Sequence, residues 1–98
     1  MPRVVPTRLA VIDLERLRVF LLEKNPEASK KASKIIKETF KKIGKTPEIY
    51  RPVQDIPYQR DAVIDFGGRG YLARFYYKPG GDVLILRVWH QLEDRDSE

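Results

Sequence analysis

Two arginines and a tryptophan near the end of the sequence are the most prominent candidates for functional side chains. Arg74 lies in one segment of alternating apolar and polar residues, and Arg87 and Trp89 lie in the next such segment. Arginine and aromatic residues are enriched in the contact surfaces of proteins, where they supply much of the binding energy. Their grouping therefore indicates a surface that binds another molecule.

Residues that could carry out catalysis are sparse. His90 is the single histidine, and we interpret it as a structural residue at the end of a strand rather than a catalyst. The absence of cysteine excludes disulfides, thiolate metal ligands and thiol nucleophiles. The glycine-rich residues 67–70 join two predicted strands, so a hairpin turn is a better account of them than a phosphate-binding loop. We expect neither a metal nor a cofactor.

Two amphipathic helices are predicted in the first half of the chain. Apolar residues spaced by three and four predict a helix over residues 7–24 that Thr7 caps, and Asn25 followed by proline restarts a helix that ends at Gly44. The polar face of the second helix carries seven lysines, which are Lys30, Lys31, Lys34, Lys37, Lys41, Lys42 and Lys45. We interpret them as a solvated helix face, and a nucleic-acid patch that lacks interleaved aromatic residues is the alternative.

The apolar period changes to two in the second half, which predicts strands over residues 61–66, 71–77 and 83–90. Residues 3–7 are predicted to form a short strand, and the proline-containing stretch 46–58 an ordered loop. The predicted fold class is therefore α+β, with one domain over residues 1–98. In it an N-terminal short strand and an α-helical hairpin pack on a C-terminal three-stranded antiparallel meander.

Symmetric closure of both hairpins divides the strand residues between two faces. The face predicted to lie under the helices carries Ala62, Ile64, Phe66, Tyr71, Ala73, Phe75, Tyr77, Leu84, Leu86 and Val88. The outward face is then predicted to carry Asp61, Val63, Asp65, Leu72, Arg74, Tyr76, Val83, Ile85, Arg87 and Trp89.

Arg74 and Arg87 are predicted to lie opposite one another on the outward face, which is unfavourable unless a negative group is near. Asp65, diagonal to Arg74, could supply that charge, and such a ladder of exposed ion pairs is the structural alternative to a binding role. An exposed Trp89 favours the binding role. We therefore predict a partner-binding surface of Arg74, Tyr76, Ile85, Arg87 and Trp89, and further functional candidates in Asp65, Arg69 and His90.

The charge balance also favours an acidic partner. Nineteen Lys and Arg residues against fourteen Asp and Glu residues give a net charge of +5. Such a charge suits nucleic acid or an acidic protein segment, and it equally suits plain solubility. No apolar run approaches the roughly 18 residues of a membrane span, so we expect a soluble, cytoplasmic protein with no membrane partner.

Several strings, in their order and spacing, resemble the RelE/ParE toxin superfamily, and the last looks particularly like its ParE branch. They are residues 10–14 with Leu17 and Phe20, residues 25–28, residues 47–52 and residues 83–91. The resemblance implies the toxin of a type II toxin-antitoxin pair, held in a hetero-oligomer by a cognate antitoxin. The antitoxin would have a DNA-binding part and a segment that wraps the toxin, so the toxin would reach operator DNA only through the antitoxin.

The resemblance implies DNA gyrase as the target of a ParE-like toxin and ribosomal A-site messenger RNA as that of a RelE-like one. The positions of the RelE-type basic residues fall at Val63, Asp65, Leu72 and near Gln91, and no tyrosine follows Tyr77. Phosphodiester cleavage needs donors that stabilise developing negative charge. We therefore expect a non-enzymatic gyrase inhibitor, with a ribosome-dependent ribonuclease and a non-toxic regulatory family member as the alternatives.

Overall fold

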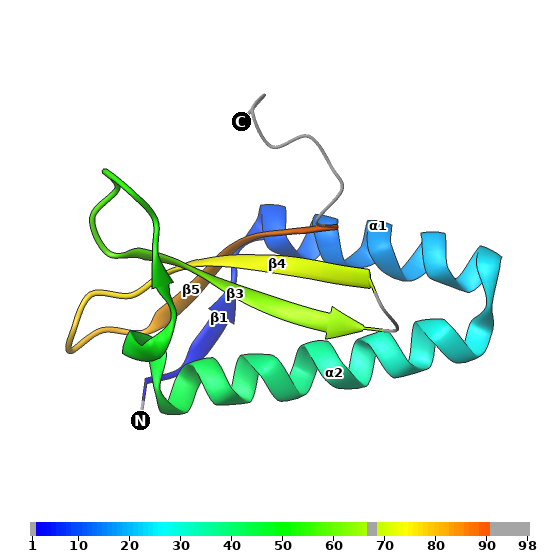
Figure 1. Cartoon of the computed structure of the whole chain (residues 1–98), viewed down its shortest axis with the longest axis horizontal. Helices are drawn as coiled ribbons and strands as arrows, with labels where there is room; N and C mark the ends of the chain where they lie inside the picture. Colours follow the sequence, from blue (N-terminus) through cyan, green and yellow to red (C-terminus); the bar gives the residue numbers. More distant parts are fainter. Residues whose placement is uncertain (1, 67–68, 91–98) are drawn as a thin grey trace.

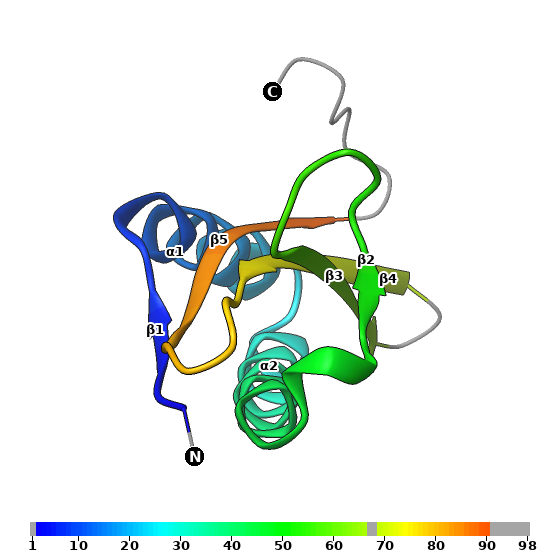
Figure 2. The ribbon, with the colours of Figure 1, turned by 90° about the vertical axis from the view of Figure 1, so that its left-hand side faces the viewer.

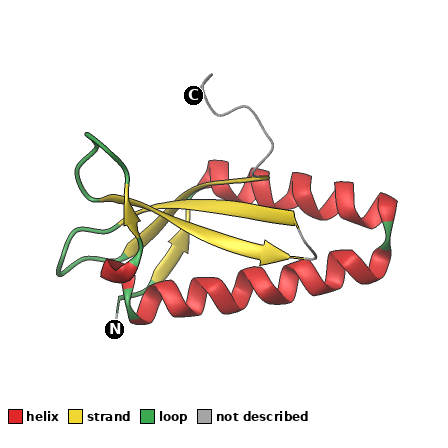
Figure 3. Cartoon of the chain, in the orientation of Figure 1, coloured by secondary structure: helices red, strands yellow, loops and turns green. Residues whose placement is uncertain are grey.

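The computed structural model describes residues 2–66 and 69–90, which form two helices on a five-stranded sheet (Figure 1, Figure 3). Along the chain the elements are β1 (Val4–Pro6), α1 (Arg8–Lys24), α2 (Pro26–Lys45), the 3-10 helix η1 (Pro47–Ile49), β2 (Arg51–Pro52), β3 (Gln59–Phe66), β4 (Arg69–Tyr76) and β5 (Val83–His90). The strand order is β1-β5-β4-β3-β2. The predicted α+β class and the antiparallel meander of β3, β4 and β5 are confirmed.

Two short edge strands extend the meander. β1 pairs in parallel with β5, so the first and last strands of the chain are neighbours, and β2 pairs antiparallel with β3. The prediction that residues 46–58 form only a loop is wrong, because this stretch contains η1 and β2. A strand of two residues is too short to show an alternation of polar and apolar residues. Its proline fits an edge strand, because the backbone on the unpaired side of such a strand needs no hydrogen-bond donor.

The helix boundaries follow from their caps. The Thr7 hydroxyl accepts a hydrogen bond from the Ala10 N–H (3.3 Å) at the start of α1. Asn25 serves both helices, because its N–H donates to the Leu21 carbonyl (2.7 Å) and its side-chain oxygen accepts from the Glu27 N–H (3.0 Å). Pro26 then occupies the first turn, where no N–H is needed. The predicted helical hairpin with its tight corner is confirmed.

Both helices bury their apolar stripes against the same face of the sheet. In Figure 2, α1 lies beside β5 and α2 lies below β3 and β4. One cluster of buried residues joins the three layers, with Ala10 and Leu17 from α1, Ile36 and Ile43 from α2, and Ala62, Ile64, Tyr71, Ala73, Phe75, Val83, Ile85 and Val88 from the sheet. Among the described residues no helix combines the length and apolar character that a membrane crossing requires.

A β-bulge changes the faces of β5. Arg74 lies opposite Arg87, as predicted, but the register then shifts so that Phe75 lies opposite Ile85. The extra residue reverses the faces of the preceding part of β5. Val83 and Ile85 are therefore fully buried in the core, whereas Leu84 and Leu86 are only half-buried. The predictions of Val83 and Ile85 as outward residues and of Leu84 and Leu86 as core residues are wrong.

Gly44 allows the end of α2 to approach β1 closely. The helix was predicted to end at Gly44, but it continues to Lys45, so that Gly44 lies inside its last turn. A Cβ atom at Gly44 would lie 2.9 Å from Val4 Cγ2. We expect Gly44→Ala to lower the free energy of unfolding by about 1 to 2 kcal/mol, since the clash outweighs the gain of about 1 kcal/mol in helix propensity. Urea denaturation would measure this, and Val4→Ala should remove the penalty. An equal loss in the Val4→Ala background would contradict the clash.

Candidate partner-binding site

The two arginines of the predicted site lie opposite one another on β4 and β5, and each holds its own carboxylate. The Arg74 Nε and Nη2 atoms donate to the Asp61 oxygens Oδ1 (2.9 Å) and Oδ2 (3.1 Å), and Asp61 lies directly opposite Arg74 on β3. Arg87 binds Asp13 in the same two-pronged geometry. Such paired hydrogen bonds are among the strongest ion-pair contacts, and they allow two like charges to lie side by side.

Asp13 links α1 to the edge of β5. Its side chain is 4% exposed, and it accepts hydrogen bonds from Arg87 Nε (2.8 Å), Arg87 Nη2 (3.1 Å) and the Val88 N–H (2.9 Å). The Thr7 hydroxyl donates to the Leu86 carbonyl (3.2 Å). Because β1 pairs with β5 only as far as Ile85, these side chains bind edge groups that no strand reaches. Asp13 is thus a buried anchor between helix and sheet.

Asp13 was not predicted from the sequence as a site residue, although its position carries a signal. Asp13 follows Ala10 by three residues and precedes Leu17 by four, which places it within the buried stripe of α1. Aspartate is almost never fully buried unless it is paired. An acid on the apolar stripe of a helix therefore indicates a carboxylate with a partner elsewhere in the fold.

Trp89 lies on the outward face, but it is covered. Its relative exposure is 4%, so the prediction of an exposed tryptophan is wrong. The guanidinium carbons of Arg74 and Arg87 lie 5.2 Å and 5.4 Å from the centre of the indole ring. At these distances the cations attract the face of the ring. The arginines, fixed by Asp61 and Asp13, use their own side chains to shield the ring that was expected to bind a partner.

The other predicted site residues are dispersed. Tyr76 is half-buried, with its ring 5.9 Å from that of Tyr58, and His90 packs edge-on against Tyr71 at 5.4 Å. Asp65 is exposed opposite Gly70, so the carboxylate predicted beside Arg74 comes from Asp61 instead. The loss of Ile85 to the core and the cover over Trp89 leave Arg74, Tyr76 and Arg87 accessible. The Arg69 side chain is outside the described part of the chain.

Helix α1 exposes a second apolar surface, on the side away from the core. It consists of Val11, Ile12, Val19 and Leu22, which are 51%, 52%, 40% and 44% exposed. Sequence analysis missed this surface because one apolar stripe was enough to explain a core-facing helix. The signal was present, because α1 carries apolar residues outside its core-facing stripe, and a helix that is apolar on more than one side is normally covered on more than one side.

A groove of about 270 Å³ runs beside this surface, between α1 and α2, with a largely apolar lining that includes Leu14, Ala32 and Phe40. Glu15 and Arg18 form an ion pair on its rim (2.7 Å). The hydrogen bond between them lowers the pKa of the Glu15 carboxyl and raises the pKa of the Arg18 guanidinium. The groove therefore presents apolar side chains beside a rim that carries the Glu15–Arg18 ion pair and Lys37.

A helical hairpin packed on this mixed sheet, at this chain length, defines a toxin domain of the RelE/ParE superfamily. A solved structure described as the chromosomal ParDE TA system from P. aeruginosa matches 92% of this chain and 96% of its own, with a TM-score of 0.73 and 26% sequence identity. The family model for the ParE toxin of the type II toxin-antitoxin system, parDE, matches residues 4–95. The chain belongs to this ParE toxin family.

Two relatives from Caulobacter vibrioides carry the name of the other branch of the superfamily. Toxin RelE1 is 32% identical to this chain over 83 residues, which cover 85% of the chain and 86% of the relative. Toxin RelE3 is 29% identical over a stretch covering 85% of the chain and 87% of the relative. The match extends over most of each protein, so the similarity concerns the whole toxin domain.

Proposed function

We propose that this ParE-family toxin inhibits growth by binding DNA gyrase, without cutting RNA, and that a cognate antitoxin neutralises it. The observation that carries the proposal is the pairing of Arg74 with Asp61 and of Arg87 with Asp13. Cleavage of a phosphodiester develops negative charge, which preorganised donors must stabilise. Two arginines that already hold carboxylates are poor donors for that purpose.

The neighbouring positions support the same conclusion. Val63 and Asp65 stand where the resemblance would place the basic residues of the nuclease branch, and both are exposed. Leu72, at the third such position, is buried. A polyanionic message would thus meet an apolar side chain and a carboxylate on this part of the sheet. A face of this kind is better suited to contact with a protein.

An antitoxin partner follows from the toxin-antitoxin family to which the chain belongs. The surfaces that we assign to it are the accessible side chains of Arg74, Tyr76 and Arg87 and the exposed apolar residues of α1. Exposed apolar residues gathered on one side of a helix are typical of sites of protein contact, and interface cores are more apolar than their rims. Together with its antitoxin the chain would form a hetero-oligomer.

A RelE-type ribonuclease is the second candidate function. It is favoured by the names of the two Caulobacter vibrioides relatives, Toxin RelE1 and Toxin RelE3. In this case Arg74 or Arg87 would have to leave its carboxylate when RNA binds. The requirement makes the two functions separable, because only the ribonuclease needs these arginines for chemistry.

Purified chain should be added, with and without its antitoxin, to a gyrase supercoiling reaction and to a translating extract that carries a defined message. We expect antitoxin-free chain to abolish supercoiling and to leave the message intact, and an equimolar antitoxin to restore supercoiling. Normal supercoiling together with A-site cleavage would overturn the proposal in favour of the ribonuclease. Normal supercoiling, an intact message and unimpaired growth on induction would instead identify a non-toxic family member.

A further inference from the structure

Five lysines form a straight stripe along α2, which we call the lysine stripe. Lys30, Lys34, Lys37, Lys41 and Lys45 recur at spacings of three and four residues, and all five are exposed. Residues three and four apart lie next to one another on a helix, with about 5 to 6 Å between their Cβ atoms. At about 1.5 Å of rise per residue the stripe is about 22 Å long.

Within the part of the chain that the structure describes, the lysines of the stripe are not neutralised by ion pairs, whereas Arg74 and Arg87 on the sheet are. The ion pairs found among the described residues involve Asp13, Glu15 and Asp61, and none of them includes a lysine of the stripe. The two acids of α2, Glu27 and Glu38, lie at one margin of the stripe, three or four residues from Lys30, Lys34 and Lys41, and offset only part of its charge. Much of the net charge of +5 is therefore gathered on one helix face.

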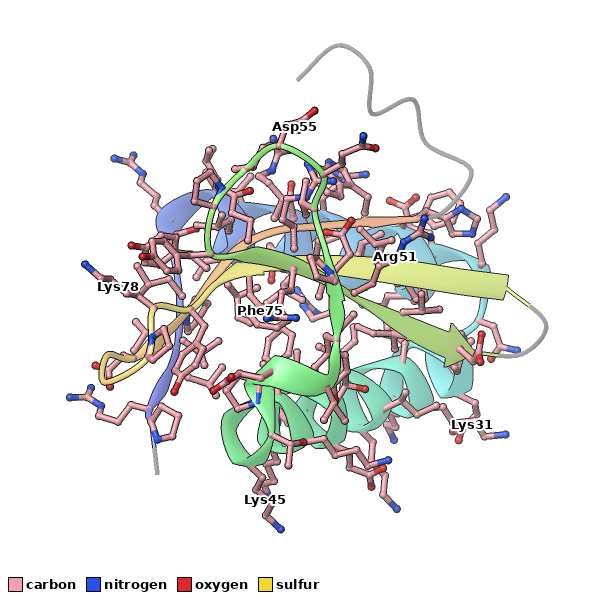
Figure 4. The ribbon with its side chains drawn as sticks, turned by 60° about the vertical axis from the view of Figure 1, so that its left-hand side comes forward. Lys31, Lys45, Arg51, Asp55, Phe75 and Lys78 are labelled. Atoms are coloured by element: carbon pink, nitrogen blue, oxygen red, sulfur yellow. The ribbon has the colours of Figure 1, made fainter. Side chains whose placement is uncertain are left out.

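The stripe lies on a ridge of the molecule. Helix α2 runs along one edge of the fold in Figure 1, and the labelled Lys45 side chain in Figure 4, at one end of the stripe, extends from it away from the sheet. All five lysines of the stripe are exposed, so a duplex that lies along α2 can reach them together.

A groove of about 510 Å³ adjoins the stripe, and its lining includes Lys30, Lys34 and Lys37 beside Ser33 and the apolar Leu22 and Pro26. The buried Ser29 of the same groove already donates its hydroxyl to the Arg18 carbonyl (3.5 Å), so Ser33 is the hydroxyl that lies beside the lysines. Hydroxyl groups and lysines are among the side chains that contact phosphate oxygens in protein–DNA complexes.

We propose that the lysine stripe binds the phosphate backbone of double-stranded DNA, without reading its sequence. An acidic protein segment fits less well, because the five lysines follow one another along the helix face with no apolar side chain between them. The apolar residues nearest to them, such as Leu22 and Phe40, line grooves on the flanks of the stripe. This activity goes beyond gyrase inhibition and antitoxin binding, since the toxin itself contacts DNA instead of reaching it only through the antitoxin.

The test is the salt dependence of binding to a 20-base-pair duplex of arbitrary sequence, followed by fluorescence anisotropy. Five lysine–phosphate contacts predict a slope of log K against log salt of about −4.5, since each contact contributes about −0.9. A variant with Lys30, Lys34, Lys37 and Lys41 changed to Gln should show a slope of about −0.9 and bind at least about tenfold more weakly at low salt.

The matched control changes Lys24, Lys31, Lys42 and Lys78 to Gln. It removes the same net charge, two of its lysines lie elsewhere on α2, and we expect it to keep nearly the full slope. Circular dichroism and urea denaturation would establish that both variants are folded. Neither gyrase nor antitoxin enters the assay, so failure of this proposal is separable from failure of the proposed function.

Three results would overturn the proposal. One is the absence of duplex binding by the unchanged chain at about 50 mM salt, where charge-driven binding is still strong. Another is an equal loss in both quadruple variants, which would show an effect of net charge alone. The last is stripe-dependent binding of a poly-glutamate peptide without binding of the duplex, which would assign the stripe to an acidic protein.

Discussion

Replacement of Asp13 by alanine is expected to lower the free energy of unfolding by about 3 to 4 kcal/mol. The change leaves the Val88 N–H and the Arg87 guanidinium without their acceptor, and loss of one partner from a buried ion pair typically costs about 3 to 5 kcal/mol. We expect the lower part of that range, because Arg87 retains 33% side-chain exposure and water can solvate it in part.

Asp61→Ala is the matched control for this prediction. It removes the carboxylate partner of the other arginine. The Asp61 side chain is 18% exposed, and its hydrogen bonds are to Arg74 rather than to a backbone N–H. We therefore expect the free energy of unfolding to fall by only about 1 kcal/mol. Asp13→Asn should fall between the two, since one amide oxygen can still accept from Val88. Urea denaturation of all three variants measures these losses. Equal losses for Asp13→Ala and Asp61→Ala would contradict the anchoring role of Asp13.

The helical half of the fold could be predicted closely from the sequence, because its signals are local. Thr7 and Asn25 cap helices through atoms within three residues, and Pro26 fixes the first turn of α2. The apolar spacing then specifies which side of each helix is buried. Three features differ from the prediction: the buried Asp13, the exposed apolar residues of α1, and Gly44, which was interpreted as a terminator and instead permits close contact with β1.

The faces of the sheet could be predicted only up to the bulge. Alternation of polar and apolar residues specifies β3 and the first half of β4. Symmetric closure of the hairpin predicts Phe66 opposite Tyr71, whereas Phe66 lies opposite Arg69. Because this shift is by two residues, Ala62 and Ile64 remain on the predicted face. In β5 the residues from Val83 to Leu86 are all apolar, so nothing in their pattern reveals a one-residue insertion. Pairings between distant strands determine this feature, and a single sequence does not display them.

The candidate site shows the same limit. The sequence correctly predicted that Arg74 and Arg87 lie opposite one another and that such a pair needs a negative neighbour. It could not identify the neighbours, because Asp13 precedes Arg87 by 74 positions and comes from a helix. With both carboxylates in place, the arginines lie over Trp89. The tryptophan that was expected to be exposed in a binding surface is therefore buried beneath them.

Trp89→Ala is therefore expected to act first on stability, with a loss of about 3 to 5 kcal/mol in the free energy of unfolding. The indole is 4% exposed, and truncation would leave a cavity beneath the two guanidinium groups and remove two cation–π contacts. Trp89→Phe keeps an aromatic face under the arginines, so its loss should stay below about 2 kcal/mol. Urea denaturation followed by circular dichroism compares the two, since the chain has no other tryptophan to report by fluorescence.

The same pair of variants separates a structural role from a binding role. Trp89→Phe, which should remain folded, is expected to bind the antitoxin as tightly as the unchanged chain, because a covered ring offers a partner almost no surface. A folded Trp89→Ala variant of unchanged stability with weakened antitoxin binding would reverse this assignment and make Trp89 a contact residue. The arginines that lie over the ring, rather than the ring itself, are then the side chains through which this part of the sheet can meet a partner.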